Sequence, residues 1–461
     1  MLIVISDLHL MDGTAGAHHV DPGVFSSVML DLAAHAREAQ ATEVTLLFLG
    51  DVFDLYRTER WFEYPLEARP WGSAPSEEAL FDIYEGVVRN NAETFTILQG
   101  SLVDQLGFAV EPVRMYVPGN HDSVVNEHPQ LRRRTRELLG MTAGDEPFPR
   151  HVLDTEHGVF ARHGHEFDRL NFEGSETYDA GELVIPEEDY RVMPIGDAMA
   201  CEYASKIAPL VAAHLPEDHP NRARIAERMR DIVDVRPLAG MVRWAMWQAT
   251  QVDKTTVKTV VRAMSEAAES MHELPFTKEW IAKHDHLGWD EADQFQAFLR
   301  ILRSFGPGNY RRALTIADKL AALNRSDRYA SGAAGDLDRL DSRPEGKDIY
   351  YVLYGHTHLA RQIPLQVLGD PPNERYRVYF NTGTWRPTHR SLFGEDGFAS
   401  WKEITYVLIY KPGELVSGGS FMNYPAVESW TGTVVVGRGR RPTAYQPIPK
   451  ILREQANTPG P

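Results

Sequence analysis

The stretch that decides the fold lies at the start of the chain and reads LIVISDLH over residues 2–9. Four apolar residues are followed at once by polar side chains that can bind a metal ion. The pattern recurs as VTLLFLGDVFD at 44–54 and as VRMYVPGNHD at 113–122. Short, mostly apolar runs of this kind are typical of strands that are covered on both faces. The opening third therefore contains three predicted buried strands, each ending in polar residues.

The segments between these strands, about 24–40 and 78–104, are long enough for helices, so the opening third reads βαβαβ. Sites in sheets built this way form at the carboxyl ends of the strands. All three polar clusters follow such an end. We therefore expect an α/β fold with a functional site at one edge of its sheet.

Two further polar clusters follow predicted strands later in the chain. The strand at 159–162 is followed by HGHE, and the strand at 349–354 is followed by GHTH. Between them, apolar residues recur at helical spacing, for example at 257, 260, 264, 268 and 271. We interpret 170–347 as a mostly helical, cap-like insertion, which ends in a mobile connector at about 325–346.

The part of the chain after the last cluster is rich in β-strand patterns. Apolar runs at 376–380, 404–410 and 433–436 are predicted to form the second sheet of a layered sandwich. The last residues contain several prolines and are predicted to be an irregular tail. The predicted organisation is therefore a core in two parts, 1–169 and 348–436, interrupted by the insertion and followed by a tail at 437–461.

Composition limits the classes of partner and compartment. The chain has 461 residues, 43% of them hydrophobic, and a formal net charge of −17. Such a charge repels long anionic polymers, so nucleic acid is a disfavoured partner. Cys201 is the only cysteine, so no intrachain disulfide is possible. Because the sequence shows neither a leader pattern nor a long apolar span, we expect a cytoplasmic enzyme without a transmembrane segment. The residues do not indicate an oligomeric state.

The polar clusters together offer carboxylates, imidazoles and one amide oxygen. This donor set suits borderline divalent ions, and the absence of thiolates argues against a closed structural zinc site. Taken singly, each cluster is an ordinary turn sequence, so the signal lies in their conjunction and order. A glycine directly precedes three of the candidates and lets the backbone turn sharply. The candidate metal ligands are Asp7, His9, Asp51, Asn120, His163, His356 and His358.

As an ordered set, these motifs resemble those of the calcineurin-like metallophosphoesterase superfamily. The matching motifs are Asp7-x-His9, Gly50-Asp51-x-x-Asp54, Gly119-Asn120-His121-Asp122, His163-Gly164-His165 and Gly355-His356-Thr357-His358, and the later Asn381-Thr382-Gly383-Thr384-Trp385 is similar to the segment that follows the family's last metal motif. The match covers 1–168 and about 348–411. The resemblance implies a four-layer α/β/β/α sandwich around a binuclear metal centre.

The resemblance also implies a role for each candidate. One metal ion would be held by Asp7, His9 and His358, a second by Asn120, His163 and His356, and Asp51 would bridge both. His121 would face the phosphate, with Asp54 orienting its imidazole, while His165 would support the ligands or face the substrate. The implied metal is Mn²⁺, with Fe²⁺ or Fe³⁺, Zn²⁺ and Ni²⁺ as alternatives.

The activity implied by the resemblance is hydrolysis of phosphoester bonds, with a metal-bridging hydroxide attacking in line. We expect a phosphodiesterase or pyrophosphohydrolase that acts on a small phosphorylated metabolite. The alternatives are a nuclease for single strands or ends and, in another class, a non-catalytic scaffold. Arg57 lies in an aromatic and basic loop after the second motif, and Arg132 lies in an arginine run after the third. Both are candidate substrate contacts, although the loop's aromatics could instead pack under the insertion.

Overall fold

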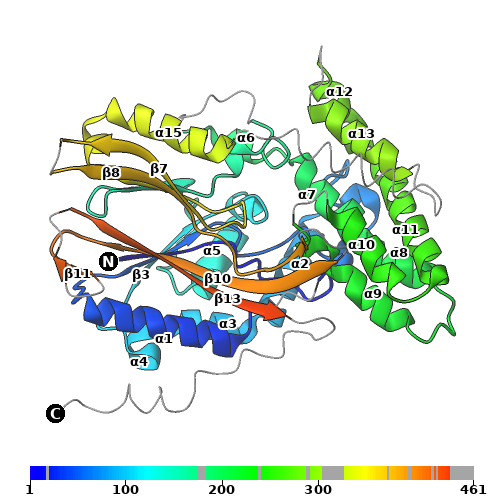
Figure 1. Ribbon diagram of the computed structural model, residues 1–461, viewed down its shortest axis with the longest axis horizontal. Coiled ribbons are helices and arrows are strands. Elements are labelled where there is room, and N and C mark those ends of the chain that lie inside the picture. Colours follow the sequence, from blue (N-terminus) through cyan, green and yellow to red (C-terminus); the bar gives the residue numbers. More distant parts are fainter. Residues whose placement is uncertain are drawn as a thin grey trace.

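The computed structural model contains two mixed β-sheets with helices around them, which confirms the predicted mixed α/β class. The helices and strands are drawn in Figure 1. The predicted tail at 437–461 lies outside the described residues. The structure describes residues 1–16, 20–174, 183–236, 240–286, 291–303, 327–370, 373–392, 397–416, 420–421 and 424–436.

The first sheet has the strand order β13-β10-β1-β2-β3. Strands β1 (Leu2–Ile5), β2 (Thr45–Leu49) and β3 (Val113–Val117) are parallel, which confirms the βαβαβ opening. Strands β10 (Phe398–Tyr410) and β13 (Ala426–Val436) extend the same sheet in antiparallel fashion. The prediction that 404–410 and 433–436 belong to the second sheet was therefore wrong, because β10 pairs with the buried edge of β1. The short strand β9 (Pro387–Ser391) pairs with β10.

The second sheet has the strand order β4-β5-β6-β8-β7. Its central strands β5 (Val159–Arg162), β6 (Tyr351–Tyr354) and β8 (Arg375–Asn381) are parallel, and β4 (His151–Asp154) and β7 (Arg361–Leu368) flank them in antiparallel fashion. Strands β5 and β6 are neighbours although the whole insertion separates them in the chain. A small separate ribbon pairs β11 (Leu415–Val416) with β12 (Ser420–Phe421).

The two sheets bury apolar side chains against each other. Val4 and Leu47 of the first sheet share one buried cluster with Val159 and Leu353 of the second. Alternate residues of the first sheet point to its other face, where they pack on helices beside it in Figure 1. The helices around this sheet are α1 (Pro22–Glu38), α2 (Glu77–Asn90), α3 (Ala92–Gln99), α4 (Leu102–Leu106) and α5 (Pro129–Leu138).

Helix α15 (Arg328–Asp341) covers the outer side of the second sheet (Figure 1). Its Leu337 and Leu340 share a buried cluster with Val352 and Tyr379 of that sheet. Asp336 accepts from Tyr354 and forms a 2.9 Å ion pair with Arg162. The prediction of a mobile connector at 325–346 was therefore wrong. The described part of this segment, from residue 327, is mostly an amphipathic helix, and its short side chains let the helix lie close to the sheet.

Except for the short α6 (Glu187–Tyr190), which lies next to α15 in Figure 1, the remaining helices of the insertion lie together at one end of the two sheets. Their buried side chains are continuous with the core of the first sheet and its helices. They are α7 (Ile195–Met199), a π-helical turn (Ala200–Ser205), α8 (Lys206–His214), α9 (Arg222–Arg230), α10 (Met241–Thr250), α11 (Lys254–Glu273), α12 (Pro275–His284) and α13 (Glu291–Arg303). Short 3₁₀ turns occupy Glu59–Glu63, Leu66–Ala68, Ser123–Asn126, His165–Phe167, Asp231–Asp234 and Pro344–Asp348.

Buried contacts fasten the insertion to the core. Glu202 of the π-helical turn accepts from Arg69 and, at 3.0 Å, from Trp71 Nε1. Trp61 is fully buried beside Trp71. Thus the tryptophan in the loop after the second motif packs in the core beneath the insertion. Among the described residues, no helix combines the length and the apolar character that crossing a membrane requires.

Candidate metal centre

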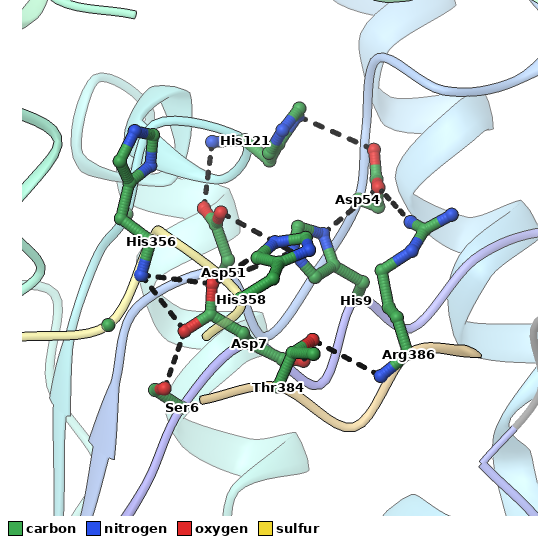
Figure 2. Close-up of polar contacts among 12 residues, drawn as sticks. Ser6, Asp7, His9, Asp51, Asp54, His121, His356, His358, Thr384 and Arg386 are labelled. Atoms are coloured by element: carbon green, nitrogen blue, oxygen red, sulfur yellow. Dashed lines mark hydrogen bonds and ion pairs between the residues drawn. The ribbon is translucent and has the colours of Figure 1, made fainter. Parts of the chain in front are cut away.

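Five loops bring their polar side chains to one point between the two sheets. The loops follow β1, β2 and β3 of the first sheet and β5 and β6 of the second. Figure 2 shows the side chains from the loops after β1, β2 and β6 converging with that of His121. Three groups of them place potential ligand atoms within 4.8 Å of one another. The groups are Asp7, His9, Asp51 and His358; Asp51, His163 and His356; and His9, Asp54 and His121.

The backbone at these loops is unusual. Five non-glycine residues have φ between 46° and 67°, a left-handed conformation that costs energy for side chains with a Cβ. The loops are held in it by hydrogen bonds between them, such as Asp7 N to Gly50 O at 3.0 Å. Strain of this kind occurs mainly at functional sites. The five residues are Asp7, His9, Asp51, His356 and His358, all of them candidate ligands.

Glycines next to the ligands are required by close packing. A Cβ at Gly50, where φ is +85°, would lie 2.1 Å from His163 Nδ1. A Cβ at Gly355 would lie 2.4 Å from Asp7 Oδ2. Neither separation is possible for real atoms, so only glycine lets these side chains approach the loops.

The first group combines two carboxylates with two imidazoles. His9 Nε2 lies 2.9 Å from His358 Nε2 and 3.6 Å from Asp51 Oδ2. His358 Nε2 lies 3.4 Å from Asp7 Oδ1. All four side chains are buried. Four potential ligand atoms from three loops are therefore gathered in one small buried space.

The second group shares Asp51 with the first. His163 Nε2 lies 3.2 Å from Asp51 Oδ2, and both side chains are fully buried. His356 completes this group, and its Nδ1 lies 3.0 Å from the amide oxygen of Asn120. All seven side chains selected from the sequence as metal ligands thus lie together, with one carboxylate common to two sets.

The ring orientations are those that metal binding needs. His9 Nδ1 lies 3.0 Å from Asp54 Oδ2, and His163 Nδ1 lies 2.9 Å from the carbonyl oxygen of Leu49. Donation from Nδ1 to these acceptors leaves the lone pair of each Nε2 free and directs it toward Asp51. Such a hydrogen bond from the opposite ring nitrogen is the usual support of a metal-binding histidine.

Two atoms in this space have unmet bonding capacity. Asp51 Oδ2 and His163 Nε2 are buried and have no hydrogen-bond partner among the described residues. Burial lowers the pKa of His163, but the Asp51 carboxylate outweighs it and raises that pKa to about 10. A positive charge beside this buried carboxylate is favourable, and a metal ion could supply it in place of the protonated His163 imidazole. These groups could hold metal ions.

His121 lies beside the two groups rather than within them. Its backbone N–H donates to Asp51 Oδ1 at 2.9 Å, while its Nδ1 lies 3.5 Å from Asp54 Oδ1 and 3.3 Å from Asp197 Oδ1. Asp197 comes from helix α7 of the insertion and also accepts from the Asn120 amide at 3.1 Å. Burial and the negative charge of Asp51 raise the pKa of Asp197 well above its usual range. Two carboxyl groups therefore flank the imidazole, although the sequence suggested only Asp54.

Asp54 is the centre of a buried charge network. Arg386 Nη1 donates to its Oδ2 at 2.9 Å and Arg57 Nη1 does so at 3.0 Å. Arg386 also pairs with Asp234 of the insertion, with Nε at 2.8 Å from Oδ1. Burial raises the pKa of Asp54, but His121 and Arg57 outweigh it and hold that pKa well below the usual range. Asp54 is therefore ionised, and its carboxylate positions Arg57, Arg386 and the imidazole of His121.

Four residues of the site were missed from the sequence. Asp168 lies 3.0 Å from His356 Nε2 and comes three residues after His165, so extending the fourth motif by three residues could have found it. Arg386 directly follows the Asn381–Trp385 segment. No local pattern marks Asp197 or Arg236, since both come from helical or turn sequence of the insertion.

The three predicted substrate contacts have different surroundings. Arg57 lines a pocket next to the metal centre. His165 is buried against Phe172, at 5.7 Å between ring centroids, and does not line that pocket. Burial lowers the pKa of His165 to about 3, so the ring is neutral. Arg132 does not line the pocket either, because its guanidinium donates to the carbonyl oxygens of Asn126 and Asp145.

The pocket has a volume of about 270 Å³ and is enclosed jointly by the core and the insertion. Asp51, His121 and His356 line one end of it. Arg236 of the insertion lines the same end, with Nη2 3.2 Å from His358 Nδ1. Its other hydrogen bonds go to backbone carbonyls, and burial, Arg57 and Arg386 lower the pKa of Arg236 to about 9. The metal end of the pocket is thus an anion-attracting site.

Sequence comparison does not assign the chain to a family. No protein-family model matches the chain, and its sequence matches no curated protein.

Proposed function

We propose that the protein is a hydrolase of phosphoester bonds with a binuclear metal centre. The observation that carries the proposal is that Asp51 belongs to two sets of potential ligand atoms, one fully buried and one that includes the half-buried His356. A carboxylate shared in this way is what two adjacent cations need. The ordered motifs support the same conclusion through their resemblance to calcineurin-like metallophosphoesterases.

The reaction is an in-line displacement at phosphorus. Two divalent ions bound there would lower the pKa of coordinated water and neutralise charge on the phosphoryl oxygens. A new P–O bond forms to the water oxygen, the P–O bond to the leaving group breaks, and a proton passes to the leaving oxygen. The imidazole of His121 faces the pocket beside the ionised carboxylate of Asp54. Burial and Arg57 hold the pKa of His121 well below its usual range, and a bound anionic substrate would raise it toward the protonated form.

The two pocket arginines would hold the substrate. Arg57 of the core and Arg236 of the insertion both line the metal end. A guanidinium forms strong, charge-assisted hydrogen bonds to phosphate oxygens. Diesters and pyrophosphates offer oxygens beyond those at the metal ions, which is why we favour a phosphodiesterase or pyrophosphohydrolase.

A small substrate fits this site better than a polymer. The pocket volume of about 270 Å³ lies near the lower end of the range for small-molecule sites, roughly 300–1,000 Å³. The net charge of −17 further opposes a long nucleic acid. A nuclease would need an open groove to bind a strand. A non-catalytic scaffold would not explain why the buried carboxylate of Asp51 belongs to two ligand groups.

The finer organisation belongs to the same proposal. The core, 1–169 with 348–436, would be the four-layer α/β/β/α sandwich of these enzymes, and 170–347 would be its cap. Support comes from Asp197 and Arg236, which the insertion contributes to the site wall. Because the donor set is made of oxygen and nitrogen atoms, Mn²⁺ is the favoured ion, with Fe, Zn²⁺ and Ni²⁺ as alternatives. We place the enzyme in the cytoplasm.

The direct test compares initial rates on bis-p-nitrophenyl phosphate and p-nitrophenyl phosphate, with Mn²⁺ and with chelator. We expect hydrolysis that requires the metal and is faster on the diester, because the second ester group can occupy the pocket beyond the metal end. Faster cleavage of the monoester would indicate a phosphatase instead. Absence of turnover on both esters with every candidate metal, in protein that has bound two ions, would favour the scaffold alternative.

Replacing Arg236 with Ala is expected to lower kcat/KM by about 10- to 100-fold, because a charge-assisted hydrogen bond to the substrate contributes roughly 1.5–3 kcal/mol. Metal content should remain at two ions per chain. The measurement is steady-state kinetics on the diester together with elemental analysis. The matched control is Arg262→Ala, an exposed arginine of α11 in the same insertion, which should leave both quantities unchanged. An unaltered kcat/KM in Arg236→Ala would remove this residue from the substrate site.

A further inference from the structure

The pocket has a second end that the hydrolytic chemistry does not use. Away from the metal centre its wall is mostly apolar, with Asn171 as a polar member, and the apolar side chains all come from the insertion. These side chains are Leu170, Met199, Ala200, Tyr203, Ala204, Val233, Met241 and Phe298.

This apolar wall is built into the packed helices. Tyr203 is 1% exposed and packs edge to face on Phe298, with ring centroids 6.1 Å apart. Met241 is also buried, whereas Met199 and Phe298 are only half-buried. The two half-buried side chains therefore keep apolar surface toward the cavity. A π-helical turn at Ala200–Ser205 carries part of the wall, and such turns occur frequently at functional sites.

The two ends of the pocket differ in what they can bind. The metal end presents Arg57 and Arg236 beside the ligand groups. Among the described residues, the apolar end offers only the Asn171 amide and the Tyr203 hydroxyl as polar partners. These are too few for the several hydroxyls of a sugar or the charges of a second phosphate, whose burial without partners is unfavourable. Binding of a hydrocarbon group would instead be stabilised in proportion to the apolar surface that the group buries there.

We propose that the substrate is an amphipathic phosphoester, with its phosphoryl group at the metal end and an apolar organic group against the apolar wall. Met199 and Phe298 are then specificity-determining residues for that organic group. The inference rests on the proposed function, since it names the substrate class of the same site.

The experiment measures binding and turnover separately. Binding of methylphosphonate and octylphosphonate to the Mn²⁺-loaded protein is followed by calorimetry, because phosphonates are not hydrolysed. We expect octylphosphonate to bind at least about 100-fold more tightly, since each buried methylene can improve affinity by up to about 4-fold. In parallel, kcat/KM for p-nitrophenyl octyl phosphate should exceed that for p-nitrophenyl methyl phosphate. Equal affinity of the two phosphonates would overturn the inference.

A pair of variants locates the apolar group. Met199→Gln keeps the length of the side chain but makes it polar, and it should reduce the ratio of octyl to methyl affinity at least about 5-fold. Met193→Gln makes the same change at a half-buried methionine that does not line the pocket, and it should keep the ratio. Thermal unfolding of both variants checks that they are folded. If Met199→Gln keeps the ratio of octyl to methyl affinity, the octyl group lies elsewhere and the proposal is refuted.

The two hypotheses fail in different ways. If no ester is hydrolysed but octylphosphonate still binds tightly and depends on Met199, the hydrolase proposal fails and the apolar subsite stands. If esters are hydrolysed with no dependence on chain length and the phosphonates bind equally, the hydrolase stands and the apolar subsite is refuted.

Discussion

Asp51→Ala is expected to reduce the metal content from two ions per chain to fewer than one and to lower turnover by roughly 10³-fold or more. The physical reason is that one carboxylate serves both ligand groups, with Oδ2 at 3.2 Å from His163 Nε2 and 3.6 Å from His9 Nε2. A catalytic metal ion contributes several kcal/mol to the transition state, and each 1.36 kcal/mol is a factor of ten in rate. Elemental analysis and initial rates on the diester measure the two effects.

A second variant separates loss of metal from loss of fold. Asp51 has φ +50°, a conformation that asparagine adopts far more readily than alanine. Asp51→Asn should therefore keep the backbone and the shape while removing the charge, and its metal content should fall as well. Asp104→Ala, an exposed carboxylate on α4, is the control that should change neither quantity. Full metal occupancy and activity in Asp51→Asn would sink the assignment of Asp51 as the bridge.

His121→Ala is expected to keep both metal ions and to lose rate by about 10²–10⁴-fold, the usual effect of removing an acid–base group. The ligand groups should survive because the contact of residue 121 with Asp51 is made by its backbone N–H, which alanine retains. The measurement pairs elemental analysis with kcat on a dialkyl phosphate diester, whose leaving group needs a proton. His272→Ala, on α11 of the insertion, serves as the control and should match the unsubstituted protein.

The choice of leaving group sharpens this test. An alkoxide needs a proton to depart, whereas p-nitrophenolate departs without one. If His121 delivers that proton, the defect of His121→Ala should be largest for alkyl leaving groups and clearly smaller for p-nitrophenolate. Metal loss in this variant would show instead that His121 is a metal ligand. Its Nδ1 lies 3.5 Å from Asp54 Oδ1 and its ring lies next to that of His9, so such a site would consist of His9, Asp54 and His121.

The opening of the chain was predictable because its signals are local. The runs at 2–9, 44–54 and 113–122 each combine a buried strand with a turn, and the polar residues follow the strand directly. Parallel pairing of β1, β2 and β3 then puts all three carboxyl ends at one edge. The glycines before the ligands also have local causes, since they allow side chains from neighbouring loops to come close.

The pairing of distant strands was not predictable in the same way. Strand β10 joins the first sheet beside β1, although its apolar run at 404–410 would suit either sheet. The segment before β6 was read as a connector because it is rich in Gly, Ala, Ser and charged residues. In the fold those small residues are what allow helix α15 to pack closely, as at Gly332 against Phe167.

The sequence by itself determined the mixed α/β class and the order and chemistry of the candidate metal ligands. These properties depend on the period of a strand and on residues that immediately follow it, so they can be read within a few positions. Only the tertiary structure decided which side chains complete the site. Asp197 and Arg236 reach the metal end from the insertion, which also supplies the apolar wall at the other end of the pocket. Arg386 reaches Asp54 across 332 positions of the chain. Such contacts depend on how separate elements pack against each other, and packing leaves no repeating pattern along the chain.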